Sequence, residues 1–203
     1  MTKRTSDEVT NHEKIDMDAL GLLLGRESAL KLEEPGPSES AFDAIFRSAV
    51  RAPDHGRLRP WRFVLIKGEA RERFGELLAE TLKAREPAAT PEMLARERQK
   101  ALRAPAIVVV AARVNSSARI PVIEQILSAG AAAQNIMLAA HALGYGAMWK
   151  TGDPAYDDRV KQALGLEATD AIVGFLYLGT RAGGAAAAAR PQPEDFVRVW
   201  EGK

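Results

Sequence analysis

The chain has 203 residues, 46% of them hydrophobic, and its 28 basic residues nearly balance 27 acidic ones, for a formal net charge of +1. This length can bury one substantial core, and this charge gives no field that would gather nucleic acid or an anionic membrane, so a small-molecule partner is favoured. The sequence contains no cysteine, which excludes disulfides, thiolate zinc sites and iron–sulfur clusters, so redox chemistry would need a borrowed cofactor.

The N-terminal part is predicted to be a disordered leader followed by a helix. Residues 1–16 are polar and lack the apolar core of a signal peptide. Asp16 is predicted to cap a helix whose leucines recur at helical spacing until Gly25 ends it. No apolar run approaches the roughly 20 residues of a membrane-spanning helix, so we expect a soluble, cytoplasmic protein.

Helices and a strand are predicted in the next part of the chain. Ser38 should cap a helix with an apolar stripe that ends before Pro53. Residues 62–67 have the pattern of a strand, and Gly68 then leads into a helix that closes at Pro87. A charged helix follows, with Pro91 at its first position.

The second half of the chain contains the predicted core. Residues 106–111 are apolar without alternation, which predicts a strand covered on both faces. Pro121 opens a helix whose part from 128 to 143 is rich in small residues, so another helix can approach it closely, either in the core or at a dimer interface. A short helix at 157–164 and an apolar strand at 171–179 complete the domain.

The C-terminal tail differs in composition from the rest. Residues 182–190 are dominated by glycine and alanine, and residues 196–200 then alternate like a strand. Five residues cannot form a sheet alone, so they should pair with an edge of their own subunit or of a partner. We therefore predict one domain at 17–180 and a C-terminal extension at 181–203.

Several common sites are missing from the sequence. It contains no phosphate-binding glycine motif of the P-loop or dinucleotide type, and no H-E-x-x-H zinc motif. Its three histidines, His12, His55 and His141, have no ligand-like spacing. No metal site is predicted, and His141 is interpreted as a packing or solvated residue on the small-residue helix.

Three clusters bring polar groups to loops beside apolar elements. Residues 26–28 combine a guanidinium with a hydroxyl, which suits a phosphate monoester, although a solvated helix end has the same composition. Residues 51–61 hold several arginines, His55 and Trp61, and the alternative there is a basic surface loop. Residues 146–152 place an aromatic, a lysine and a hydroxyl at the end of a predicted strand, where layered α/β folds build sites.

These clusters together resemble the nitroreductase family, in its small YdjA-like branch. The resemblance covers residues 17–180 in the same order. It is carried by M-D-A-L at 17–20 with R-E-S at 26–28, R-A-P-D-H at 51–55 with P-W at 60–61, L-G-Y-G-A-M-W-K-T-G at 143–152, and I-V-G-F-L-Y-L-G-T at 172–180.

The resemblance implies a three-layer α+β fold with a mixed central sheet, and a homodimer that exchanges C-terminal segments and binds one FMN per subunit at its interface. By position, the FMN phosphate and ribityl chain would be held by Arg26, Glu27 and Ser28. Further flavin contacts would come from Arg51 and His55. The segment along the isoalloxazine ring would be Trp149, Lys150, Thr151 and Gly152, with backbone N–H groups of the last two facing N5 and O4.

The implied reaction passes a hydride from NAD(P)H through FMN to a small-molecule acceptor such as a nitroaromatic, quinone or activated alkene. The flavin carries the chemistry, so no catalytic side chain is predicted. Lys150 would stabilise negative charge on the ring, or face solvent. The alternatives are a flavin-storage protein, a reductive dehalogenase of the same fold, and a protein that binds through its basic loop.

Two residues depart from the family pattern. Glu27 stands where a basic or neutral residue is usual, so its carboxylate would oppose phosphate binding and its backbone alone is expected to contribute. Arg59 replaces a glutamine before the Pro-Trp pair and would change the shape of the substrate site.

Overall fold

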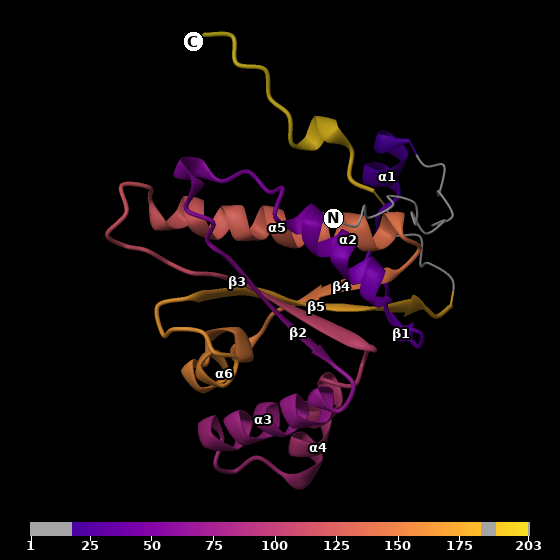
Figure 1. Ribbon diagram of the computed structural model, residues 1–203, viewed down its shortest axis with the longest axis vertical. Helices are drawn as coiled ribbons and strands as arrows, with labels where there is room; N and C mark the ends of the chain where they lie inside the picture. Colours follow the sequence, from indigo (N-terminus) through magenta and orange to yellow (C-terminus); the bar gives the residue numbers. More distant parts are fainter. Residues whose placement is uncertain (1–17, 184–189, 203) are drawn as a thin grey trace, which may run out of the picture.

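The computed structural model describes residues 18–183 and 190–202 and shows a sheet between two helical layers (Figure 1). One face of the sheet is covered by α2 (Glu39–Ala49) and α5 (Val122–Ala142). The opposite face carries α3 (Ala70–Arg85), α4 (Pro91–Lys100) and α6 (Asp158–Ala163). This is the three-layer α+β arrangement that the sequence predicts. The leader predicted for residues 1–16 lies outside the described residues.

Five strands form the sheet in the order β1-β5-β3-β2, and β4 also pairs with β5. The α3–α4 hairpin leads the chain out and back, so Ala106 of β3 starts beside Lys67 of β2. Every pairing among the described residues is antiparallel, whereas a mixed sheet was implied by the resemblance. The strands are β1 (Leu32–Glu33), β2 (Trp61–Lys67), β3 (Ala106–Ala112), β4 (Gly146–Lys150) and β5 (Ala171–Arg181).

The core is built around β3, as its uninterrupted apolar sequence predicts. All of its residues are buried. Val108 and Val110 pack in the cluster beneath α5, and Ile107 and Val109 pack in the cluster beneath α3. A strand covered on both faces needs no polar alternation. The outer edge of β2 has no neighbouring strand in the described part of the chain.

Local capping decides where the first two helices begin. Ser38 caps α2 as predicted, because its Oγ accepts a hydrogen bond from the backbone N–H of Ala41. The prediction of Asp16 as the cap of α1 (Ala19–Gly25) was wrong, since Asp18 is the N-cap. Its carboxylate accepts from the N–H of Gly21 at 2.8 Å, which satisfies one of the free amides of the first turn.

The C-terminal segment leads away from the layered body (Figure 1). Apart from one 3₁₀ turn at Pro193–Asp195 (η3), residues 190–202 form no regular structure. Phe196 and Trp200 are 75% and 80% exposed. The strand predicted for residues 196–200 therefore does not form on the sheet of its own chain. None of the described helices is long and apolar enough to cross a membrane.

Candidate functional site

The structure divides the predicted site residues between the two ends of α5. His55 contacts Glu124 in the first turn of α5, with 2.6 Å between Nδ1 and Oε2. Arg26 leaves α1 beside the last turn of α5, where a Cβ built on the preceding Gly25 would lie 3.5 Å from Nε2 of His141. At 1.5 Å of rise per residue, Glu124 and His141 are roughly 25 Å apart along the helix. One small ligand cannot contact both groups within a single subunit.

A charged cluster surrounds Arg26 at the C-terminal end of α5. Glu27 forms an ion pair with Arg181, the last residue of β5, and both side chains are largely buried. The backbone oxygen of Arg26 accepts a hydrogen bond from Arg190 at 3.2 Å. Nη1 of Arg26 and Nε2 of His141 are buried and have no hydrogen-bond partner among the described residues. These unused polar atoms beside two arginines suit an anionic ligand.

The environment of His141 favours the neutral form of its imidazole. Burial lowers the pKa of its imidazole, and the nearby guanidinium groups of Arg181 and Arg26 lower it further. Glu27 acts in the opposite direction. The interpretation of His141 as a packing or solvated residue is therefore incomplete, because its ring faces the predicted phosphate-binding residues.

The loop at residues 51–61 is ordered by contacts with the other end of α5. Nε1 of Trp61 donates to Oγ of Ser128 at 2.9 Å, and Ser128 donates to the carbonyl oxygen of Pro53 at 2.6 Å. Arg57 and Arg59 adopt positive φ angles of 55° and 49°, which non-glycine residues rarely do. Arg51 lies on the wall of an open basic cavity of about 590 Å³. The other residues of that wall include Arg57, Arg59 and Arg62.

Trp149 is mainly a packing residue. Its Nε1 donates to the carbonyl oxygen of Val173 at 3.2 Å, and its ring contributes to the cluster beneath α5. A Cβ built on Gly174 would lie 2.1 Å from Nε1 of Trp149, so only glycine leaves room for the indole there. The Trp149 side chain is thus packed against the sheet, so within the segment predicted to lie along a flavin ring only the backbone of Trp149 is left to contact a ligand.

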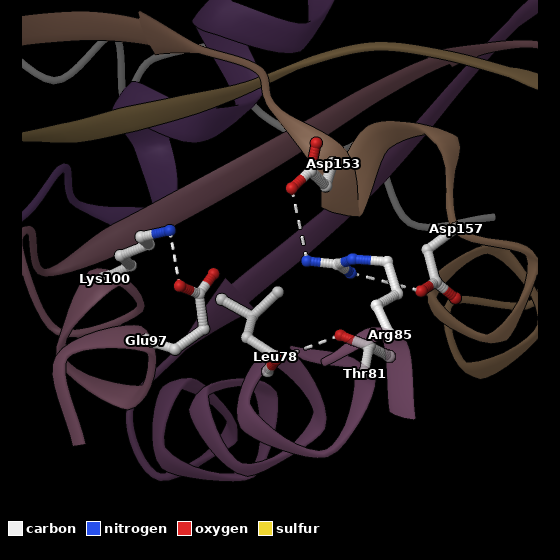
Figure 2. A network of polar contacts seen from close by, with 7 residues as sticks. All are labelled: Leu78, Thr81, Arg85, Glu97, Lys100, Asp153 and Asp157. Atoms are coloured by element: carbon white, nitrogen blue, oxygen red, sulfur yellow. Dashed lines mark hydrogen bonds and ion pairs between the residues drawn. The ribbon is translucent and has the colours of Figure 1, made fainter. Parts of the chain in front are cut away.

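Lys150, Thr151 and Gly152 line a cavity of about 390 Å³ between β4, β5 and the α3–α4 hairpin. Its floor is apolar and includes Phe74, Leu78 and Phe175. Figure 2 shows its polar border, where Arg85 of α3 binds Asp153 and Asp157 and so ties the loop after β4 to α3. On the same border, Lys100 forms an ion pair with Glu97, which is only 7% exposed.

A smaller cavity of about 160 Å³ lies beside β4, and its wall includes Leu30 and Leu32 from the chain that follows residues 26–28. Ala29 and Met148 belong to its wall, and Ala29 donates to the carbonyl oxygen of Ala147 at 2.9 Å. Lys150 and Tyr177 line both cavities. Burial raises the pKa of Tyr177 to about 12, so its hydroxyl stays protonated near neutral pH. Two adjoining cavities therefore lie beside β4, and the residues of the Arg26 cluster are not part of their walls.

Comparisons with known proteins identify the family. The model of the nitroreductase family matches residues 24–180. The chain belongs to the nitroreductase family. The Escherichia coli K12 protein named "Putative NAD(P)H nitroreductase YdjA" is 39% identical over 182 residues, which cover 89% of this chain and 98% of that protein. A Haemophilus influenzae protein named "Putative NAD(P)H nitroreductase" is 34% identical over 165 residues, which cover 81% of this chain and 89% of that protein. These matches confirm the predicted family and its oxidoreductase class.

Solved nitroreductases confirm the fold. A nitroreductase-like family protein from Bacillus cereus superposes with a TM-score of 0.75 at 23% identity and covers 100% of both chains. A Desulfovibrio desulfuricans nitroreductase, solved in complex with FMN, gives a TM-score of 0.68 at 25% identity and covers 89% of this chain and 95% of its own.

The nitroreductase site contains residues that the sequence did not reveal. Arg181, Arg190 and Tyr177 were not predicted to belong to it. Tyr177 lies within the motif at 172–180, whereas the two arginines lie outside every motif. Arg181 and Arg190 reach Arg26 and Glu27 only through the fold of β5 and of the tail. A weak signal existed for Arg181, since it directly follows the last motif, 172–180. In the described ranges, no group of three or more metal-ligating side chains is found.

Proposed function

We propose that this nitroreductase-family protein is an FMN-dependent oxidoreductase that works as a homodimer and uses NAD(P)H as its electron donor. The observation that carries the proposal is the Arg26 cluster, whose buried atoms Nη1 of Arg26 and Nε2 of His141 have no partner among the described residues. The cluster offers cationic groups for a phosphate, and the cavity at Lys150, Thr151 and Gly152 offers backbone donors beside an apolar floor. The relatives named for NAD(P)H and the neighbour solved with FMN support the same assignment.

The phosphate of FMN would lie at Arg26. Nη1 of Arg26 is buried without a partner, and a phosphate oxygen would supply the missing acceptor. Ser28 is exposed nearby and offers a hydroxyl. The residue types therefore fit the phosphate end of the cofactor, with Glu27 as the one opposing charge.

The ring would lie toward Lys150, Thr151 and Gly152. β4 begins at Gly146, where a built Cβ would lie 3.4 Å from Cβ of Arg181, and it ends at Lys150 on the wall of the larger cavity, so the strand would link the phosphate end to the ring. Gly152 has a φ of 119°, a backbone conformation that glycine adopts readily. When bound, FMN supplies the redox chemistry, accepting a hydride from NAD(P)H and passing it to an acceptor such as a nitroaromatic, quinone or activated alkene. The protein residues orient the ring and exclude water from one of its faces.

A second subunit would complete the site. The outer face of α5 exposes Ile123 and Leu127, at 59% and 64%, and Gly130 has open space beside it. If two copies of α5 pack antiparallel across a two-fold axis, Arg51 and His55 of one subunit approach Arg26 of the other. This arrangement accounts for predicted site residues at opposite ends of one helix.

The tail would anchor the dimer at the free edge of β2. A strand edge with unpaired backbone groups accepts an added strand, and residues 196–200 are exposed and alternate in polarity. Pairing would bury Phe196 and Trp200 on the partner. The tail extends away from its own sheet (Figure 1), which leaves it free for this contact.

Flavin content of the purified protein tests the function. We expect yellow protein that NAD(P)H bleaches, and we expect Arg26→Ala to lose FMN, because a charge-assisted hydrogen bond contributes about 1.5–3 kcal/mol. Arg47→Ala is the matched control, since Arg47 is an exposed arginine paired with Asp43 on α2. Undiminished FMN in Arg26→Ala would refute the phosphate assignment, and a colourless protein that cannot be loaded with FMN would refute the function.

A further inference from the structure

The carboxylate of Glu27 lies among the groups that would hold the cofactor phosphate. Its partner is Arg181, and the side chains of Glu27 and Arg181 are only 22% and 27% exposed. Arg26 precedes it in the chain, and His141 faces the same cluster from the last turn of α5. The cluster thus contains two arginines and one carboxylate, which pairs with Arg181, so it keeps an excess of positive charge.

Two polar atoms of this cluster have no partner in the described part of the chain. They are Nη1 of Arg26 and Nε2 of His141, and both are buried. Buried polar atoms are normally hydrogen-bonded, so these two unpartnered atoms point to a ligand that accepts from Arg26 and, when Nε2 carries a proton, from His141. A carboxylate already present satisfies Arg181 and leaves both atoms unsatisfied.

We propose that Arg181 and His141 complete the phosphate site with Arg26, and that Glu27 is an internal anion which the phosphate must displace from Arg181. The inference rests on the proposed function. It assigns cofactor contacts to two residues outside the family motifs, and it gives the unusual Glu27 a role as a competitor that weakens cofactor binding.

The displacement of Glu27 by the phosphate follows from the charge and the position of the two anions. A phosphate and a carboxylate repel one another, and both cannot occupy Nη1 of Arg181. Glu27 is in a non-helical stretch after α1, so its side chain can turn outward without breaking a helix. Binding therefore exchanges one anion for another at Arg181, and it adds acceptors for Arg26 and His141.

The same arrangement of charges makes the affinity for FMN depend on pH. The charged groups around His141 are Arg26 and Glu27 after α1 and Arg181 from β5, and Arg190 of the tail binds the backbone of Arg26. In the free protein the two arginines oppose protonation of the imidazole. A phosphate dianion would reverse the sign of the local charge, so binding should take up a proton on His141 and strengthen as the pH falls.

The test is the dissociation constant of FMN for the full-length protein, measured by quenching of flavin fluorescence. Glu27→Gln should tighten FMN binding about tenfold, which corresponds to about 1.4 kcal/mol. Arg181→Ala should weaken it by a similar factor. Riboflavin, which lacks the phosphate, should bind all these variants equally. Glu69→Gln and Arg73→Ala, from an exposed pair on α3, are the matched controls.

His141→Gln tests the third group. Proton uptake on FMN binding, measured by calorimetry in buffers of different ionisation enthalpy, should be smaller in this variant than in the wild type. Because Glu27→Gln is nearly isosteric, it still tests the proposal if Arg181→Ala or His141→Gln fails to fold.

The outcomes separate the two proposals. If Arg26→Ala loses FMN while the Glu27, Arg181 and His141 variants behave like the surface pair, the inference is overturned and the proposed function stands. If the wild-type protein binds neither FMN nor riboflavin, the proposed function fails and the inference fails with it.

Discussion

Trp61 and Ser128 are joined by a hydrogen bond of 2.9 Å between Nε1 and Oγ, which fastens the start of β2 to α5. The same hydroxyl donates to the carbonyl oxygen of Pro53, so one serine holds both ends of the basic loop. This loop carries Arg51 and His55, and its position on α5 therefore depends on a buried polar residue rather than on apolar packing alone.

Removing this hydroxyl should destabilise the protein. Ser128→Ala leaves the indole N–H and the Pro53 carbonyl without their partner, which costs about 1–3 kcal/mol when such groups are buried. Urea unfolding measures the change. Ser117→Ala is the control, since Ser117 is exposed and only its backbone N–H is hydrogen-bonded. Equal stability of the two variants would mean that the loop is held by other contacts.

Gly174 should tolerate no side chain. In Gly174→Ala the new Cβ would collide with Trp149, and overpacking of this kind costs about 1–3 kcal/mol or more. The companion change Trp149→Phe removes Nε1, the nearest of the colliding indole atoms, so the double variant should recover part of the loss. A double-mutant cycle in urea that shows purely additive effects would contradict the contact.

The dimer should depend on the exposed face of α5. Leu127→Glu places a charge at the proposed two-fold contact, and we expect a monomer by light scattering together with loss of FMN. Leu102→Glu, at another exposed leucine that follows α4, should remain dimeric. Deletion of residues 191–203 should also weaken the dimer, and a truncated protein that stays dimeric and fully yellow would exclude the tail as an anchor.

If each FMN site contains residues of both subunits, variants that lack different site residues should restore FMN binding to each other in mixed dimers. Arg26→Ala and His55→Ala should each bind FMN poorly as pure dimers. After unfolding and refolding together, half of the dimers are mixed and each mixed dimer contains one intact site, so about one quarter of all sites should recover FMN. Flavin absorbance measures the recovery. No recovery in a sample shown to contain mixed dimers would place both residues in sites of a single subunit.

Stability should fall on acidification because of His141. Burial together with Arg181 and Arg26 lowers the pKa of the folded imidazole below its ordinary value of 6.5. The unfolded state then binds more protons than the folded state as the pH drops through the ordinary pKa of 6.5, so the free energy of unfolding decreases below about pH 7. His141→Leu should flatten this slope in urea titrations of the FMN-free protein. Parallel curves for wild type and variant would contradict the assignment.

Features that depend on local contacts could be predicted from the sequence. The uninterrupted apolar run predicted the buried β3, Ser38 predicted the start of α2, and Gly25 predicted the end of α1, because each depends on neighbours within a turn of helix or a few residues of strand. The cap of α1 was misplaced by two residues because Asp16 and Asp18 are both suitable, and only the helix geometry selects Asp18. The short β1 carries too few residues for any pattern.

The arrangement of the site was decided by tertiary structure. Glu27 and Arg181 are 154 positions apart, and they meet because β1 pairs with the end of β5 in one register. The distance of Arg51 and His55 from Arg26 within one subunit is set by the length of α5, and none of the sequence motifs indicates that length. Side-chain propensities act locally, whereas these contacts depend on which elements pack together. The sequence alone therefore determined the family and the candidate residues, and the fold determined which of them share a pocket.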